Sequence, residues 1–236
     1  MPVNKNYKDS VFTALFSQPA LLRDLYCAIK NVNLPPDVPV SMPPYGRRAY
    51  RKLIIYAAQM RGLGFNTLEN VLFMDFYNDI SFEIAGKLVV LIEHQSTINP
   101  NISLRLLLYI ARLLEKRVKG RTLYSKKPVS IPWPEFYVLY NGIEPYPDDA
   151  VLQLSDIFEK PEELGLVKQV RPLLELEVRV ININEGRNQA IANRCSKLAK
   201  YSALIAKVRA FWGELGNLEE AIKTAIKYCS KHDILI

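Results

Sequence analysis

NDISFEIAGKLVVLIEHQS, residues 78–96, predicts two β-strands that fold back on each other at Gly86. Both flanking runs are rich in β-branched and aromatic residues, and the glycine between them is typical of a turn. Both runs carry apolar side chains at even numbers, Ile80, Phe82 and Ile84 in the first and Leu88, Val90 and Ile92 in the second. These two sets face one core only if the connection holds an odd number of residues. A three-residue loop at residues 85–87 therefore places Ile80 opposite Ile92.

The same register gathers polar side chains at the open end of the predicted hairpin. Asp79 lies opposite Glu93, with Cβ atoms roughly 4.5–5.5 Å apart. Gln95 shares the face of Glu93, whereas His94 points to the other face as a core histidine. Two carboxylates this close repel unless a cation lies between them or one is protonated. Mg²⁺ binds through one or two carboxylates, so these acids form a candidate metal site; a solvated or salt-bridged pair is the alternative.

Several motifs resemble one known family, the Rpn recombination-promoting nucleases, which are also labelled as transposases. The resemblance covers most of the chain and is weakest over residues 31–66. It rests on YKDSVF at 7–12, NDISF at 78–82, LIEHQST at 91–97, LRLLLY at 104–109 and FYVLYNG at 136–142.

The resemblance implies the PD-(D/E)XK nuclease superfamily and a restriction-endonuclease-like α/β fold. The superfamily motif is an acid on one strand, followed on the next strand by an acid, any residue and usually a lysine. Asp79 takes the first position, Glu93 the second and Gln95 the position of the lysine. The glutamine departs from the superfamily motif, although the family commonly carries it. Because an amide cannot act as a base, Gln95 is expected to orient a water molecule or the phosphate.

Composition points to a globular chain with an anionic partner. The 236 residues are 49% hydrophobic and 23% charged, enough for one well-buried core. The net charge of +7 favours nucleic acid or an acidic membrane surface. Three widely spaced cysteines provide neither a disulfide framework nor a zinc motif. With no signal peptide and no membrane-length apolar run, we expect a cytoplasmic protein that does not enter membranes.

The N-terminal region predicts a helix followed by a loop. Apolar residues recur at helical spacing over residues 8–30, and Pro19 is expected to divide that helix. Asp9 has two interpretations: a favourable charge at a helix start, or an accessory acid of the active site. Prolines make residues 31–46 a connecting loop, and residues 72–77 lead into the hairpin as a strand.

A basic helix is expected after the hairpin, beginning at residues 100–103. Its apolar side chains are predicted to pack inward: Leu104, Leu107, Leu108, Ala111 and Leu114. Basic side chains follow another stripe and continue through the most basic stretch, residues 112–127. A helix directly after the metal strand suits phosphate contacts, and a solvated helix face is the alternative. The candidate DNA-binding residues are Arg105, Arg112, Lys116 and Lys119.

The remaining segments complete a mixed α/β sheet flanked by helices. Residues 135–141 and the alternating segment 174–183 are predicted strands, and helices are predicted from residues 188 and 218. We therefore divide the chain into a nuclease-like domain, residues 1–184, and a C-terminal helical appendage, residues 185–236.

Together these features predict a Mg²⁺-dependent DNA endonuclease associated with recombination or mobile-element activity. Asp79, Glu93 and Gln95 form the catalytic set, and the two acids hold the metal. The alternative function is a DNA-binding or assembly module whose catalysis is weak or lost, consistent with glutamine in place of lysine. The sequence leaves self-association into a homo-oligomer open.

Overall fold

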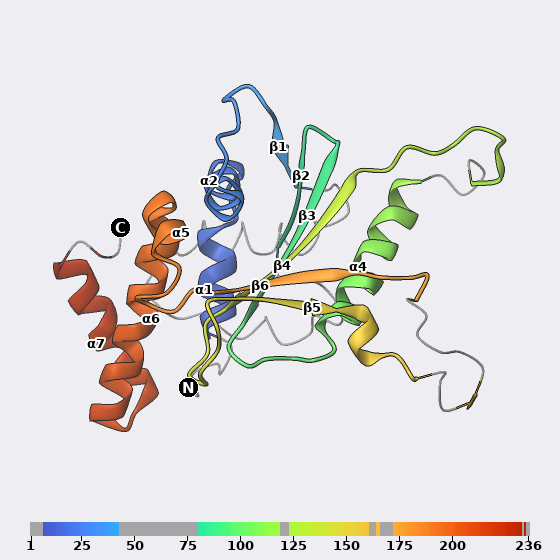
Figure 1. Ribbon diagram of the computed structural model, residues 1–236. Coiled ribbons are helices and arrows are strands. Elements are labelled where there is room, and N and C mark those ends of the chain that lie inside the picture. Colours follow the sequence, from blue (N-terminus) through green and yellow to red (C-terminus); the bar gives the residue numbers. More distant parts are fainter. Residues whose placement is uncertain are drawn as a thin grey trace.

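A six-stranded mixed sheet with helices on both faces forms the body of the protein (Figure 1). The computed structural model describes residues 7–42, 80–118, 123–160, 164–165, 172–232 and 234. The sheet runs in the order β1-β2-β3-β4-β6-β5. The mixed α/β class predicted from the sequence is thus confirmed. The strands of the sheet are β1 (Val40–Ser41), β2 (Ile80–Ile84), β3 (Leu88–Gln95), β4 (Trp133–Tyr140), β5 (Asp149–Gln153) and β6 (Glu177–Asn182).

The β2–β3 hairpin has the predicted register. Ile80 pairs with Ile92, and Ile84 pairs with Leu88 across the three-residue loop. Ala85 and Gly86 both adopt positive φ, 51° and 65°, which closes the loop. The even-numbered apolar residues consequently point into one core, as the alternation of the two strands required.

Three neighbouring strands are parallel, so their carboxyl ends lie at one edge of the sheet. β3 pairs in parallel with β4, and β4 with β6. Antiparallel β1 and β5 complete the sheet at its two sides. Strand β5 was not predicted from the sequence, because its apolar and polar residues alternate only weakly; Val151 in this strand is 57% exposed.

The first core lies between one face of the sheet and helices α1 (Tyr7–Leu15), α2 (Pro19–Lys30), α5 (Gln189–Arg194) and α6 (Ser196–Leu215) (Figure 1). Phe12, Ile92 and Tyr201 are members of this core and are essentially inaccessible to solvent. The predicted division of the first helix is confirmed, because Pro19 is the first residue of α2, where its missing N–H is not needed.

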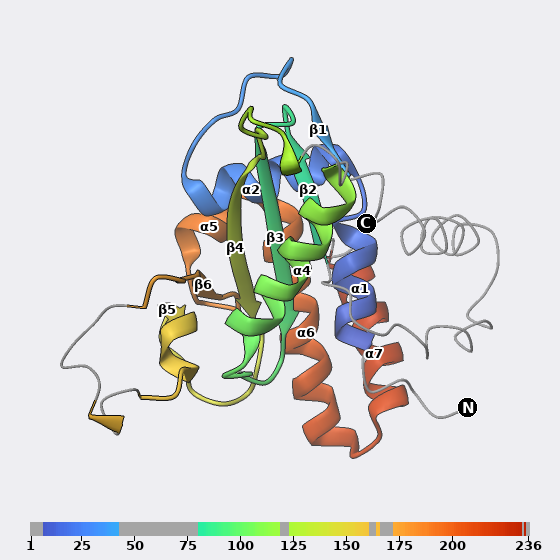
Figure 2. The same cartoon turned by 90° about the vertical axis from the view of Figure 1, so that its right-hand side faces the viewer.

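Helix α4 (Ile102–Arg117) covers the opposite face and packs over β3 and β4 (Figure 2). Its buried residues are Ile102, Ser103, Leu106, Tyr109 and Ile110. The predicted inward set was therefore wrong for Leu104, Leu108 and Ala111. Leu104 and Leu108 are 42% and 44% exposed, and Ala111 is exposed as well. Apolar residues occur on most sides of this helix, so their spacing alone did not specify which side faces the sheet.

The C-terminal helices α5 and α6 pack against the sheet through the first core. The long helix predicted from residue 188 is interrupted at Cys195, which separates α5 from α6. The first half of α6 contributes to the first core, and its second half forms a small core with α7 (Leu218–Lys231). The boundary after residue 184 stays a prediction. Among the described residues, no helix has the length and apolarity needed to cross a bilayer.

Some expectations fall on residues that the structure does not describe. Among them are the end of the proline-rich loop, residues 43–46, the strand at residues 72–77 and the side chain of Asp9.

Candidate functional site

Glu93 is a buried carboxylate near the carboxyl end of β3. Its side chain is 3% exposed, and its Oε2 accepts a hydrogen bond from Arg105 Nη2 at 3.1 Å. Burying a carboxylate is costly unless a cation and hydrogen bonds compensate for lost hydration. The central strand thus holds a negative charge in place at the edge where parallel strands β3, β4 and β6 end.

Arg105 lies on the first turns of α4 and connects the carboxylate to solvent. Its Nη2 also donates to the Tyr109 hydroxyl at 3.2 Å, while 37% of its side chain remains exposed. From its sequence, Arg105 was compatible with either a phosphate contact or a solvated helix face. The structure instead places it beside Glu93, where a guanidinium can share its donors between a carboxylate and an incoming oxyanion.

Glu93 and His94 point to opposite faces of the sheet. The His94 ring stacks on Phe12 with ring centroids 4.9 Å apart, and its Nε2 lies 2.8 Å from the Tyr201 hydroxyl. Those partners belong to the first core, whereas Arg105 extends from the helix on the other face. The prediction that His94 is a core histidine is confirmed. By strand alternation, Gln95 shares the face of Glu93, as predicted.

Asp79 lies outside the described residues. The pairing of Ile80 with Ile92, on which its predicted position depends, is confirmed. Within the described ranges no three His, Cys, Asp or Glu side chains gather as a metal-binding group. Glu93 is an oxygen donor of the kind that Mg²⁺ prefers, and the paired site of Asp79 and Glu93 stays a prediction.

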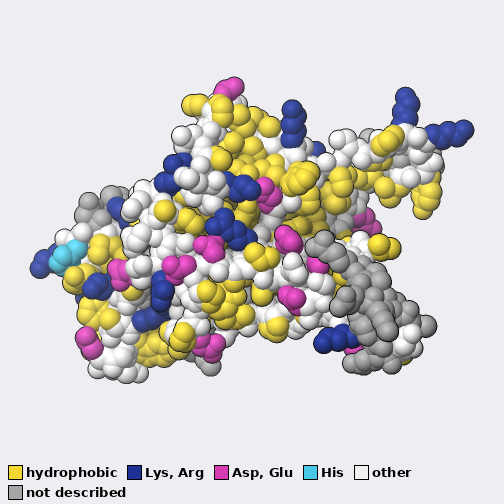
Figure 3. Space-filling view, viewed as in Figure 1, with side chains coloured by type: hydrophobic (Ala, Val, Ile, Leu, Met, Phe, Trp, Pro, Cys, Tyr) yellow, Lys and Arg dark blue, Asp and Glu magenta, His cyan; other side chains and the backbone are white. Residues whose placement is uncertain are grey.

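The predicted DNA-binding residues of α4 occupy different surroundings. Arg112 and Lys116 are exposed, Arg105 contacts Glu93, and Lys119 lies outside the described residues. Beyond α4, residues 123–132, which lead to β4, project from the body and carry basic side chains at their tip (Figure 3). The described part of this loop contains Lys126 and Lys127.

A second arginine–glutamate pair holds the C-terminal end of α4 on the same face. Arg117 Nη1 lies 2.6 and 2.7 Å from the two carboxylate oxygens of Glu83, and its Nη2 donates to the Gly86 carbonyl at 3.2 Å. Neither pair was predicted, although two acids on a covered sheet face indicate that the covering helix supplies the countercharges.

The fold and site define a mixed α/β protein whose central parallel strand carries a buried, arginine-paired glutamate. Residues 73–225 match the family model of the YhgA-like putative transposases, Transposase_31. This match spans more than half of the 236 residues, so the chain belongs to that family. No curated protein and no solved structure matches significantly.

Proposed function

We propose that this protein is a metal-dependent DNA endonuclease of the restriction-endonuclease-like kind. The observation that carries the proposal is Glu93, held near the carboxyl end of a buried central strand in a hairpin of the predicted register. The family description associates its members with mobile elements, which require DNA cleavage or joining. The net charge of +7 supports a polyanionic substrate.

Asp79 and Glu93 would hold the metal ion, most suitably Mg²⁺. When bound, the ion would neutralise charge on the scissile phosphate and lower the pKa of a water ligand. Gln95 donates and accepts hydrogen bonds but takes up no proton, so its role is to orient the phosphate or the water. Arg105 offers a partly exposed guanidinium that can donate to a phosphate oxygen beside Glu93.

A non-catalytic DNA-binding or assembly module is the second candidate. The ion pair between Arg105 and Glu93 favours it, because a guanidinium that already compensates the carboxylate opposes entry of a metal. The glutamine at position 95, where the superfamily usually has lysine, points the same way. The second candidate lacks catalysis, so DNA cleavage is the property that separates the two functions.

Incubation of supercoiled plasmid with the purified protein, with Mg²⁺ or with a chelator, tests the proposal. Nicked or linear product that requires Mg²⁺ is the expected result. Mg²⁺ should also raise the melting temperature, because a ligand that binds only the folded state stabilises it. Absence of both cleavage and Mg²⁺ stabilisation would favour the non-catalytic module.

Charge reversal on α4 tests where DNA binds. The double change Arg112→Glu and Lys116→Glu should weaken binding to all sequences alike, because phosphate contacts carry no direct sequence information. Each lost phosphate contact should reduce the slope of log K against log salt concentration by about 0.9. Fluorescence anisotropy at several salt concentrations, with Ca²⁺ in place of Mg²⁺, measures this slope.

Lys223→Glu provides a control on a different helix. Lys223 is 65% exposed on α7 and pairs with Glu219. The control should leave the slope nearly unchanged. An unchanged slope in the α4 variant would place the DNA on another surface.

A further inference from the structure

The motif at Asn141 and Gly142 lies directly beside the strand end that carries Glu93 and Gln95. The backbone N–H of Asn141 donates to the Gln95 carbonyl at 2.8 Å, which extends the parallel pairing of β3 and β4 by one bond. Asn141 is fully buried, although it follows the last residue of β4. The position of the Gln95 peptide group therefore depends on where Asn141 is held.

Gly142 permits a close approach at the same point. A Cβ atom there would lie 2.5 Å from the Ser96 carbonyl oxygen and 2.1 Å from the Tyr140 hydroxyl. The Tyr140 hydroxyl is itself engaged, because it donates to the Glu144 carbonyl at 2.8 Å. Backbone on one side and an anchored side chain on the other leave no room for a methyl group. The chain segments after β3 and β4 are thus packed against each other.

Arg209 of α6 binds Asn141 through two hydrogen bonds, and we call this set of Arg209 contacts the Arg209 clamp. Its Nη2 donates to the Asn141 backbone carbonyl at 2.6 Å and to Asn141 Oδ1 at 2.8 Å, and its Nη1 donates to Asn184 Oδ1 at 2.7 Å. A rigid guanidinium fork suits several acceptors at once, whereas lysine offers a single ammonium group. Arg209 joins the loops after β4 and β6 and fixes both to α6.

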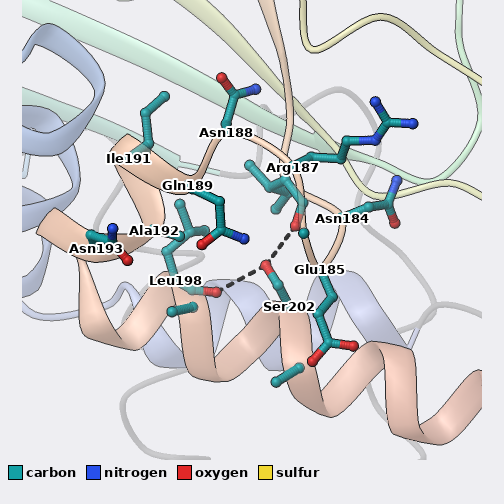
Figure 4. A pocket seen from close by; sticks show the side chains of 14 residues that line it. Asn184, Glu185, Arg187, Asn188, Gln189, Ile191, Ala192, Asn193, Leu198 and Ser202 are labelled. Carbon is teal, nitrogen blue, oxygen red and sulfur yellow. Dashed lines mark hydrogen bonds between the residues drawn. The ribbon is translucent and has the colours of Figure 1, made fainter.

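Asn184, the second residue that Arg209 contacts, is held in place by its own hydrogen bonds. Asn182 Oδ1 accepts from the backbone N–H and the side-chain amide of Asn184, at 3.1 and 2.9 Å. Asn184 also lines a cavity of about 250 Å³ between the loop after β6 and α6 (Figure 4). On its wall, the Ser202 hydroxyl lies 2.5 Å from the Ile183 carbonyl, which ties that loop to α6 (Figure 4).

We propose that Arg209 is a positioning residue for the candidate active site, acting through Asn141 on the Gln95 end of β3. The inference rests on the proposed nuclease function. Arg209 fixes the strand end, Gly142 lets Ser96 approach, and Glu93 and Gln95 keep their relative geometry. Catalytic groups that move by a fraction of an ångström lose rate without losing substrate affinity.

Arg209→Met tests this role by removing the donors while keeping the length of the side chain. We expect kcat for plasmid nicking to fall about 10- to 100-fold, the range typical of losing a residue that orients a ligand group. KM should change by less than about threefold, because the interaction is not with the substrate. Arg209→Lys keeps the charge and reaches fewer acceptors, so its kcat should lie between those of the parent and of Arg209→Met.

Arg187→Met is the matched control. It removes the same charge from the loop after β6, where Arg187 is 55% exposed and pairs with Asp148. The kcat and KM of Arg187→Met should equal those of the parent. Unchanged kcat in folded Arg209→Met, or a raised KM with a smaller salt slope, would overturn the positioning role; the second result would mean that Arg209 contacts DNA.

Hydrogen exchange distinguishes this inference from the nuclease proposal. The Asn141 amide should exchange faster in Arg209→Met than in Arg187→Met, when each is compared with amides in the middle of β3. A parent that does not cleave DNA would contradict the nuclease function alone. Equal exchange in the two variants would refute the clamp, whether or not the parent cleaves.

Discussion

Glu93→Gln is expected to reduce Mg²⁺-dependent nicking of supercoiled plasmid by at least about 10²-fold, comparable to removing a preorganised electrostatic group elsewhere. The change keeps the shape of the side chain and removes the charge that would bind the metal. Arg105 is 37% exposed and can turn toward water, so the free energy of unfolding should change little. The melting-temperature increase that Mg²⁺ gives the parent should disappear.

Glu83→Gln is the matched control for that experiment. Glu83 lies on the adjacent strand of the same hairpin, and it too is paired with an arginine of α4, Arg117. It belongs to the same sheet face but lies near the hairpin loop, away from the proposed metal site. The rate of plasmid cleavage by Glu83→Gln should stay within about threefold of the parent's rate. If Glu93→Gln cleaves as fast as Glu83→Gln, the proposed active site is wrong.

Of the substitutions proposed here, Phe12→Ala should cause the largest decrease in the free energy of unfolding. Phe12 is fully buried and packs against Phe16, His94 and Tyr201. Truncating a buried phenylalanine costs about 3–5 kcal/mol of unfolding free energy. For a chain of this size, the melting temperature should fall by roughly 10 °C. Urea titration followed by circular dichroism measures the free energy.

Trp212→Ala separates this cavity effect from loss of an aromatic ring in general. Trp212 is 49% exposed near the end of α6, so its removal should cost less than about 1 kcal/mol. Equal destabilisation by the two changes would contradict the packing described for Phe12 and, with it, the structural role of His94.

The hairpin register was predictable because it depends on local alternation. Strands have a side-chain period of two, and the first strand carries apolar residues only at even positions. Pairing them with the even-numbered apolar residues of the second strand requires a loop with an odd number of residues. The same alternation assigned Glu93 and His94 to opposite faces. These inferences needed no knowledge of what covers either face.

The partners across the sheet were not predictable in the same way. Which residue meets Glu93 depends on the rotation of α4, and the apolar residues of that helix are compatible with several rotations. Leu88 to Ile92 is a continuous apolar run, which is typical of a strand buried on both faces, but it does not specify the covering helix. The Arg209 clamp depends on contacts between three segments far apart in sequence. One of its acceptors is the backbone carbonyl of Asn141, which leaves no mark on the sequence pattern.

The packing of α1 against α6 has a consequence for the order in which the protein folds. The Tyr201 hydroxyl lies 3.4 Å from the Lys8 carbonyl, 193 positions earlier in the chain, and Arg194 donates to the Val32 carbonyl at 2.7 Å. During synthesis the β2–β3 hairpin and α4 form from neighbouring residues, but the first core cannot close until α6 has emerged. Until then α6 does not shield the side chains of Phe12 and Ile92 from water. Contacts between residues this distant in sequence also form slowly. During synthesis, His94 should therefore stay reachable by water until α6 has emerged.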